Sequence, residues 1–283
     1  MFGFINIYKP QGKTSHDVVA ILRRLTKIKQ IGHTGTLDPF AEGVLPICIG
    51  KATRLIEYLD DEKAYIGKVQ FGKSTTTYDT EGEVVKFSDK KITKDDIQNA
   101  LCKFRGKIQQ FPPIYSAIKV NGKKLYEYAR NNEEVEIKPR EVEIFSLEIA
   151  DFDEKNQTAD LYIECSKGTY IRSIAHDLGE ILGCYGYLVK LIRTKAGKFE
   201  LDKSVKLDDL LSGENVQEKL IYPTEYLNYP KYDLNETEKQ KVVNGMSINV
   251  NLQDGLVLLL WNKGLAAIAN VTDKKAKILK MFL

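Results

Sequence analysis

The segments of this chain that are patterned as strands and as helices follow one another without a regular strand–helix–strand alternation. Alternating apolar residues predict strands, whereas apolar residues three and four positions apart predict amphipathic helices. A regular alternation would indicate an α/β protein with a parallel sheet, and its absence favours an α+β protein. We therefore expect an α+β fold whose sheet is mixed and mostly antiparallel. The predicted helices are 15–28, 51–59, 93–105 and 170–183, and the predicted strands are 44–49, 64–71, 141–149, 158–165 and 186–193.

Local signals mark the ends of two predicted helices. Ser15 is a residue type that often caps a helix N-terminus, and it directly precedes the first apolar-periodic positions. Thr93, with Asp96 three residues later, resembles a capping box, and Gly106 is a typical helix stop. We therefore expect the first helix to be capped by Ser15 and the third by Thr93.

Residues 111–139 depart from both patterns. They contain Pro112-Pro113, an Asn121-Gly122 turn, three tyrosines and several lysines. Such a composition is typical of an irregular, partly exposed insertion.

Proline and tyrosine residues around 223–233 predict a linker into a short β-rich tail. We therefore predict a main domain of residues 1–228, which contains the insertion, and a small β-rich domain of residues 229–283. The strands expected in the tail are near 246–251, 256–261 and 265–271.

Composition excludes several classes of protein. Of the 283 residues, 43% are hydrophobic and 29% are charged, as in soluble globular proteins. No apolar run approaches the roughly 18 residues needed to cross a bilayer, and the N-terminus lacks the features of a signal peptide. The four cysteines form no CxxC pair and the three histidines are scattered. We therefore expect a cytoplasmic protein with reduced thiols, no metal site and no membrane partner.

The net charge is only +3, but the charges are unevenly distributed. Residues 1–54 contain eight basic and three acidic residues, and residues 165–200 contain six and three. Residues 141–164 contain one basic and eight acidic residues. Such segregation can create a basic face that suits a polyanionic partner, but chance clustering of surface charges gives the same counts.

One segment matches the phosphate-loop pattern GxxxxGK[ST]. It runs from Gly67 to Ser74, but its interior alternates like a strand and no helix pattern follows it. A phosphate loop requires free N–H groups that open a helix N-terminus. We therefore interpret the match as chance and expect no nucleotide cofactor.

The densest group of polar residues lies between Gly32 and Pro39. Its two glycines allow close backbone approach, His33 and two threonines supply hydrogen-bonding groups, and Asp38 precedes a rigid proline. An Asp-Pro pair is also common in ordinary turns. The spacing of these residues leaves both readings open.

The run Gly32–Leu55 resembles the catalytic motif of the TruB family of tRNA pseudouridine synthases. Two features depart from the family pattern: Ile192 replaces a frequent arginine, and the tail after about residue 230 matches poorly. The other motifs occur in the family's order, and they are Ile7–Ser15, Tyr65, Tyr115–Lys119, Gly122–Arg130, Ser166–Arg172 and Leu191–Thr194.

The resemblance implies the pseudouridine synthase fold, with an insertion at about 111–139 that grips the T-arm of tRNA and a C-terminal domain similar to PUA RNA-binding domains. It also implies an isomerase that converts to pseudouridine the uridine of the tRNA TΨC loop. The base would be flipped out, and an aspartate would assist cleavage and re-formation of the glycosidic bond. Because no electrons are transferred overall, no cofactor is expected.

The resemblance also assigns roles to single residues. Asp38 corresponds to the catalytic carboxylate, and Arg172 to a buried arginine that keeps this acid ionised against desolvation. Tyr65 corresponds to a tyrosine that stacks on the target base, and His33 to a histidine that fills the space left by that base. Lys9, Pro10, Tyr170 and Leu191 correspond to walls and supports of the pocket, and Lys119, Lys123, Lys124 and Arg130 to phosphate-binding residues of the insertion.

Two alternatives use the same motifs. A non-catalytic protein that binds tRNA or assists RNA folding would need the insertion, but not Asp38, Tyr65 and Arg172 together. A guide-RNA-dependent synthase subunit would be expected to have long basic extensions, which this chain lacks. We therefore expect a stand-alone enzyme, with a monomer as the default. The sequence leaves open which atom Asp38 attacks and which RNAs are substrates.

Overall fold

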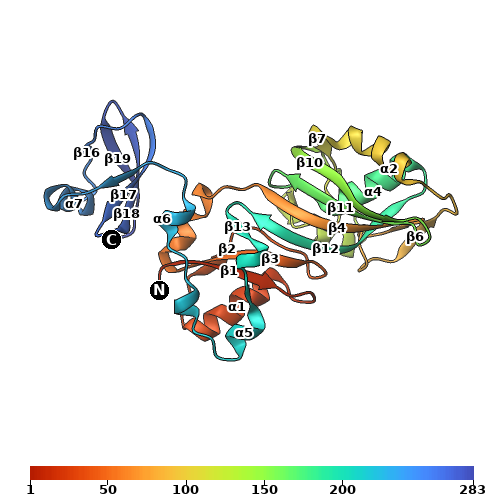
Figure 1. Ribbon diagram of the computed structural model, residues 1–283, viewed down its shortest axis with the longest axis horizontal. Coiled ribbons are helices and arrows are strands. Elements are labelled where there is room, and N and C mark those ends of the chain that lie inside the picture. Colours follow the sequence, from red (N-terminus) through yellow and green to blue (C-terminus); the bar gives the residue numbers. More distant parts are fainter.

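The computed structural model describes residues 1–283, and its strands form two large sheets at different ends of an elongated molecule (Figure 1). The ten-stranded sheet contains only two parallel pairs, β1 with β14 and β3 with β12. The prediction of a mixed, mostly antiparallel sheet is therefore confirmed. The strands follow the order β14 (Val205–Lys206), β1 (Gly3–Lys9), β3 (Glu42–Ile49), β12 (Gly186–Ala196), β4 (Lys63–Phe71), β11 (Thr158–Cys165), β10 (Arg140–Asp153) and β7 (Gly106–Gln110), while β2 (Ile31–His33) pairs with β3 and β13 (Phe199–Glu200) pairs with β12.

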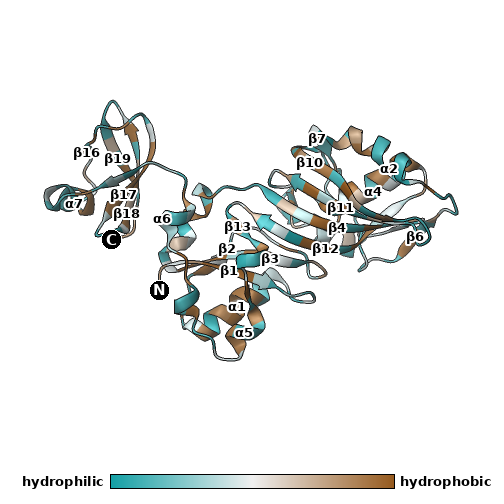
Figure 2. Cartoon of the chain, in the orientation of Figure 1, coloured by the Kyte–Doolittle hydropathy of each residue, from teal (hydrophilic) through white to brown (hydrophobic).

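Helices cover this sheet in two groups (Figure 1). Helices α1 (Ser15–Thr26) and α5 (Leu207–Leu211) lie beside the β1–β3 half, and α2 (Lys94–Leu101) and α4 (Ile171–Leu182) beside the β10–β12 half. Figure 2 shows hydrophobic residues along the strands and on α1 and α5. The apolar residues of these helices and of the sheet form one continuous core of buried side chains.

Helix α1 is capped by Thr14 rather than by Ser15. The Thr14 hydroxyl accepts a hydrogen bond from Asp17 N at 3.0 Å, and Asp17 Oδ2 accepts one from Thr14 N at 2.8 Å. Ser15 is instead a buried first residue whose Oγ contacts both backbone groups of Leu37, at 2.9 and 3.1 Å. The expected cap was therefore wrong by one residue, because Ser15 is needed for a tertiary contact.

Other local expectations are confirmed or refined. Helix α2 has the capping box of Thr93 and Asp96 that the sequence predicts. The short helix expected at 51–59 is a 3-10 helix, Gly50–Tyr58 (η1). The segment Gly67–Ser74 lies in β4 and in β5 (Lys73–Thr75), which pairs with β6 (Val84–Phe87), so it forms no phosphate loop.

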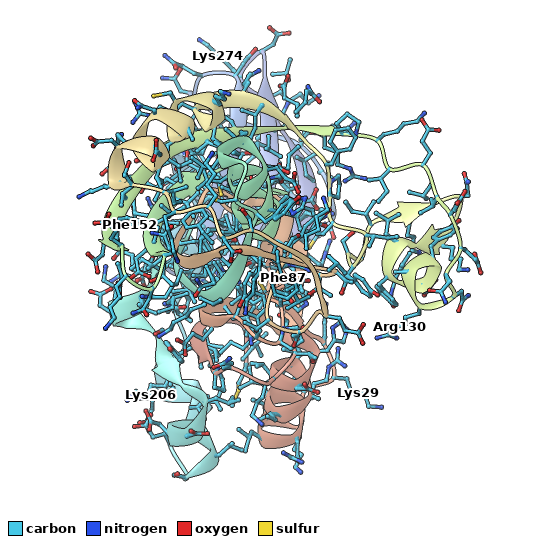
Figure 3. The ribbon with its side chains drawn as sticks, turned by 90° about the vertical axis from the view of Figure 1, so that its right-hand side faces the viewer. Lys29, Phe87, Arg130, Phe152, Lys206 and Lys274 are labelled. Carbon is cyan, nitrogen blue, oxygen red and sulfur yellow. The ribbon has the colours of Figure 1, made fainter.

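The insertion projects from the body on the right-hand side of Figure 3, beside the labelled Arg130. It contains a hairpin in which a two-residue turn joins β8 (Lys119–Val120) to β9 (Lys123–Lys124). Helix α3 (Leu125–Arg130) follows. Asn121 and Gly122 both have positive φ, 51° and 83°, as the predicted Asn-Gly turn requires.

The C-terminal sheet packs against the 3-10 helix η1. Lys51 Nζ donates to Leu283 O at 2.8 Å, Arg54 Nη1 donates to Met281 O at 3.0 Å, and Phe282 belongs to a buried cluster shared with β3. Helix α7 (Glu236–Val243) and strand β19 (Lys275–Met281) were not predicted. After the linker helix α6 (Pro223–Tyr226), the sheet order is β15 (Lys231–Asp233), β17 (Gly255–Trp261), β18 (Gly264–Thr272), β19 and β16 (Ile248–Asn249).

Candidate active site

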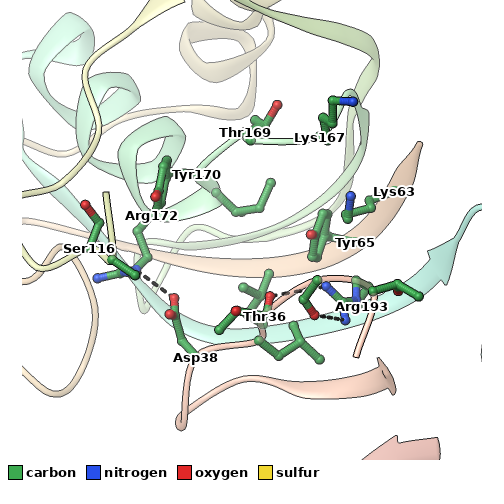
Figure 4. A pocket seen from close by; sticks show the side chains of 17 residues that line it. Thr36, Asp38, Lys63, Tyr65, Ser116, Lys167, Thr169, Tyr170, Arg172 and Arg193 are labelled. Carbon is green, nitrogen blue, oxygen red and sulfur yellow. Dashed lines mark hydrogen bonds and ion pairs between the residues drawn. The ribbon is translucent and has the colours of Figure 1, made fainter. Parts of the chain in front are cut away.

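A cavity of about 340 Å³ opens where β4 and β12 meet the turn after β2, the start of α4 and the base of the insertion (Figure 4). It brings together five of the predicted site residues, Asp38, Tyr65, Tyr170, Arg172 and Leu191. Its other lining residues are Thr34–Leu37, Lys63, Ser116, Ala117, Lys167–Thr169, Ile171 and Arg193.

Asp38 and Arg172 form an ion pair at one end of this cavity. Arg172 Nε lies 2.9 Å from Asp38 Oδ2, and the two side chains are 6% and 34% exposed, respectively. The Nε–H bond does not point at the oxygen, so the contact is electrostatic rather than a directed hydrogen bond. The exposed third of Asp38 faces the cavity, where a bound molecule would reach it.

Arg172 is fixed by further contacts. Its Nη1 lies 3.3 Å from Asp79 Oδ2 and donates to Thr77 O at 3.1 Å, while Nη2 donates to Tyr115 O at 3.1 Å. A cation in the first turn of a helix is opposed by the helix dipole. The carboxylates of Asp38 and Asp79 offset this cost and fix the guanidinium between the sheet and the insertion.

Burial raises the pKa of Asp38 above its ordinary value, and the charge of Asp79 raises it further, while Arg172 lowers it. The sequence-based expectation was that Arg172 would offset the desolvation. It does so only in part, because the effect of burial is larger and the same guanidinium also serves Asp79. Asp38 therefore binds a proton more readily than an exposed aspartate does.

The turn that carries Asp38 is attached to the body by buried groups. Lys9 is fully buried, and its Nζ donates to Lys13 O at 2.7 Å, Pro10 O at 3.0 Å and Pro39 O at 3.4 Å. Burial lowers the pKa of Lys9 to about 8. Lys9 and Pro10 thus support the turn from behind and do not line the cavity.

Aromatic and apolar side chains form the walls. Tyr65, on β4, is 7% exposed, and burial raises its pKa to about 12. Tyr170 precedes α4, and its N–H donates to Gln110 Oε1 at 2.8 Å. Leu191, on β12, is 5% exposed. An aromatic and apolar wall of this kind can hold a planar ring against Tyr65.

His33 lies outside the cavity lining, at the end of β2. Its ring packs edge-on against His16, with centroids 5.8 Å apart, and its Nδ1 is buried without a partner. Burial and the neighbouring charges of His16 and Arg193 lower the pKa of His33, which favours a neutral ring.

The four basic residues assigned to the insertion also lie outside the cavity. Lys119 is exposed, Lys123 Nζ lies 2.6 Å from Glu133 Oε2, and Lys124 Nζ contacts Tyr126 Oη at 3.0 Å. The Arg130 guanidinium lies over the Tyr126 ring, 5.2 Å from its centroid. All four residues lie on the insertion, where Lys123 is paired with a carboxylate.

Sequence reasoning missed two buried charged residues, Asp79 and Arg193. Asp79 lies in a Thr-rich stretch after β5 that has no recognisable motif, and its role depends on a contact with distant Arg172. Arg193 belongs to the last family motif, but its position gave no role. No group of three or more His, Cys, Asp or Glu side chains is arranged to hold a metal ion. None of the helices has the length and apolar character required to cross a membrane.

Family models match two adjacent parts of the chain. Residues 23–171 match the N-terminal domain of the TruB family pseudouridylate synthases, and residues 172–228 match the tRNA pseudouridylate synthase B C-terminal domain.

Curated relatives are similar over most of their length. A protein of Clostridioides difficile named tRNA pseudouridine synthase B is 47% identical over 87% of this chain and 83% of its own. One of Listeria innocua with the same name is 42% identical over 99% of this chain and 97% of its own.

Solved structures are similar over the whole chain. A Cbf5-Nop10-Gar1 complex matches with a TM-score of 0.73 and 25% identity, covering 100% of this chain and 85% of that one. An H/ACA RNP bound to a substrate RNA matches with a TM-score of 0.72 and 23% identity, over 100% and 85%. The chain therefore has the α+β fold of these proteins, with a β-rich C-terminal part consistent with a PUA-like domain.

Proposed function

The chain belongs to the TruB family of pseudouridine synthases, and from this premise we propose that it isomerises the uridine of the TΨC loop of tRNA, with Asp38 as the catalytic carboxylate. Membership makes it an isomerase that acts on uridine in tRNA. The observation that supports the assignment of Asp38 is its ion pair with Arg172 at the wall of the cavity.

The reaction breaks the N1–C1′ bond of uridine, turns the base and forms a C5–C1′ bond, while C5 loses a proton and N1 gains one. The two bond changes balance, so the chemistry needs no electron donor. A single carboxylate can serve as the nucleophile or as the base in such a sequence. The raised pKa of Asp38 makes it a better proton acceptor than an exposed aspartate.

We propose that the target base leaves the RNA stack and enters the cavity between Tyr65 and Leu191, with Tyr170 as a further wall. Extrusion of a base costs a few kcal/mol, which stacking on an aromatic ring helps to offset. His33 would then occupy the space that the base leaves, because it lies beside the cavity without lining it. A neutral imidazole suits such stacking, and the lowered pKa of His33 favours that form.

The insertion would hold the T-arm. Ser116 and Ala117, near its base, line the cavity, so RNA bound along the arm would reach Asp38. Lys119, with Lys123, Lys124 and Arg130, would contact phosphates and so position the RNA without reading its bases.

We also propose that residues 1–228 form the catalytic domain and that residues 229–283 form an RNA-binding domain. The second family model ends at residue 228, and the five-stranded sheet begins at β15, which supports this division. We propose that the enzyme acts on tRNA without a guide RNA, as a monomer.

The test is tritium release from a T-arm stem-loop that carries 5-³H-uridine, with protein and no additive. Wild type should release one tritium per target uridine, and a stem-loop with cytidine at that site should show no conversion there. Asp38→Asn should bind the stem-loop normally and release none. Asp209→Asn is a matched control, because Asp209 is an exposed carboxylate of α5 that lies outside the cavity lining. Normal turnover by Asp38→Asn would refute the assignment, and tight binding without turnover by wild type would favour a non-catalytic RNA-binding protein.

A further inference from the structure

Arg193 is a fully buried arginine directly opposite Tyr65 in the sheet. The two residues are partners in the antiparallel register of β12 and β4, and Arg193 is 1% exposed. Side chains of directly opposed residues lie on the same face of a sheet, roughly 5 Å apart at Cβ. Figure 4 shows both at the end of the cavity away from Asp38 and Arg172.

The guanidinium donates hydrogen bonds to three backbone carbonyls. Its Nε donates to Val44 O at 2.7 Å, Nη2 to Gly35 O at 3.1 Å and Nη1 to Thr36 O at 3.3 Å. Arg193 takes part in none of the ion pairs of the molecule, whereas the other buried arginine, Arg172, has two carboxylates. Each nitrogen of the guanidinium therefore has a hydrogen-bond partner, while its charge stays unpaired.

An unpaired buried charge is costly compared with a hydrocarbon side chain of similar volume. The neighbouring inward position of the same strand is filled by Leu191, an apolar side chain. The cost indicates a role for the charge beyond packing.

The field of Arg193 reaches the groups around the cavity. It contributes to the lowered pKa of Lys9, of Lys63 and of His33, and it opposes the rise that burial causes in the pKa of Tyr65. Two of its carbonyl partners, Gly35 and Thr36, belong to the turn that leads to Asp38. One side chain thus connects the proposed carboxylate turn to the proposed stacking tyrosine.

Resting on the function proposed above, we propose that Arg193 is a positioning residue of the active site, which fixes the Gly35–Asp38 turn through its carbonyls and holds a positive charge beside Tyr65. The positive charge stabilises negative charge that develops on the detached uracil. The carbonyl contacts fix the turn, and so set the distance between Asp38 and the uracil ring stacked on Tyr65. A misplacement of about 1 Å in such a site can cost about a hundredfold in rate.

The experiment compares Arg193→Lys with wild type in two readouts. The first is the single-turnover rate of tritium release, together with the Kd for the stem-loop. The second is the resonance of Tyr65 in protein labelled with ¹³C at the tyrosine Cζ, assigned by Tyr65→Phe and measured without RNA. Lysine retains the charge but cannot reach three carbonyls in a planar fork.

Arg193→Lys should stay folded, bind the stem-loop with a nearly unchanged Kd, react about ten- to a hundredfold more slowly, and shift the Tyr65 resonance while that of Tyr170 stays in place. Lys190→Met is the control, because Lys190 lies on the same strand with its side chain 58% exposed and should change neither readout.

A wild-type rate, an unmoved Tyr65 resonance or loss of the fold in Arg193→Lys would each overturn the proposal, the last by showing a purely structural role. Failure of the proposed function gives a different result, because wild type would then release no tritium. The Tyr65 resonance needs no substrate and would still report on Arg193.

Discussion

Asp79 Oδ2 lies 3.3 Å from Nη1 of Arg172, while Asp38 Oδ2 lies 2.9 Å from Nε of the same guanidinium. One buried cation therefore joins two carboxylates that come from different loops. The three groups together carry one negative charge when all are ionised. Burial is the main cause of the raised pKa of Asp38, and the charge of Asp79 adds to it, so the pKa is raised although an arginine contacts the carboxylate.

Asp79→Asn should shift the acid limb of the pH–rate profile to lower pH. Ionised Asp38 is the proposed active form, so activity falls as the pH drops through its pKa. Asp79 raises this pKa, so neutralising Asp79 lowers it. The substitution also weakens the anchor of Arg172 and should slow the plateau rate about tenfold. Single-turnover rates from about pH 5 to about pH 8 measure both effects, and a limb that moves upward would contradict the arrangement.

Lys9 should make stability depend on alkaline pH. Burial lowers its pKa from 10.5 to about 8, so between these values the unfolded state binds more protons than the folded state. The free energy of unfolding should therefore increase as the pH rises through this window. It should decrease again as the pH falls back through about 8. Urea unfolding of wild type and of Lys9→Met at about pH 7.5 and about pH 10 isolates this contribution. If the difference in unfolding free energy between wild type and Lys9→Met were the same at both pH values, Lys9 would not be desolvated.

Replacing the insertion lysines should weaken RNA binding without changing chemistry. The triple variant Lys119→Ala, Lys123→Ala, Lys124→Ala should raise the Kd for the stem-loop and reduce the slope of log K against log salt by about 0.9 for each lost phosphate contact. The rate at saturating enzyme should stay near that of wild type, because none of these residues lines the cavity. Lys206→Ala is the control, since Figure 3 shows Lys206 at the lower end of the molecule, away from the insertion. An unchanged salt slope would show that these lysines of the insertion make no contact with RNA phosphates.

Gly43→Ala should destabilise the protein far more than Gly213→Ala. Both glycines have strongly positive φ, 107° and 115°, which costs a non-glycine residue about 1–2 kcal/mol. A Cβ at Gly43 would also collide with the backbone of Arg193, whereas one at Gly213 meets nothing within 4 Å. Gly43→Ala should therefore lose about 2 kcal/mol or more of unfolding free energy beyond the loss in Gly213→Ala, as measured by chemical denaturation. This difference measures how tightly β3 and β12 pack under the active site. Equal losses of unfolding free energy in the two variants would show that the Arg193 backbone shifts readily to accommodate the added Cβ.

Much of this molecule follows from short-range patterns in the chain. The α2 cap at Thr93 and the Asn121-Gly122 hairpin need only neighbouring residues, and the mostly antiparallel sheet was inferred from the order of the strand and helix patterns. The family motifs also selected Asp38, Tyr65 and Arg172, which the fold brings to one cavity. Ser15 shows the limit of local reasoning, because a contact with Leu37 uses the side chain that would otherwise cap α1.

The chain by itself determined which carboxylate, arginine and tyrosine are available and in which order they occur. Only the tertiary structure decided their electrostatics, because the cost of burying Asp38 and the effect of Asp79 depend on side chains brought together from distant segments. The same holds for Arg193, whose charge matters because β12 places it opposite Tyr65, where it forms no ion pair. Desolvation and Coulomb interaction depend on three-dimensional distance, which sequence spacing does not encode.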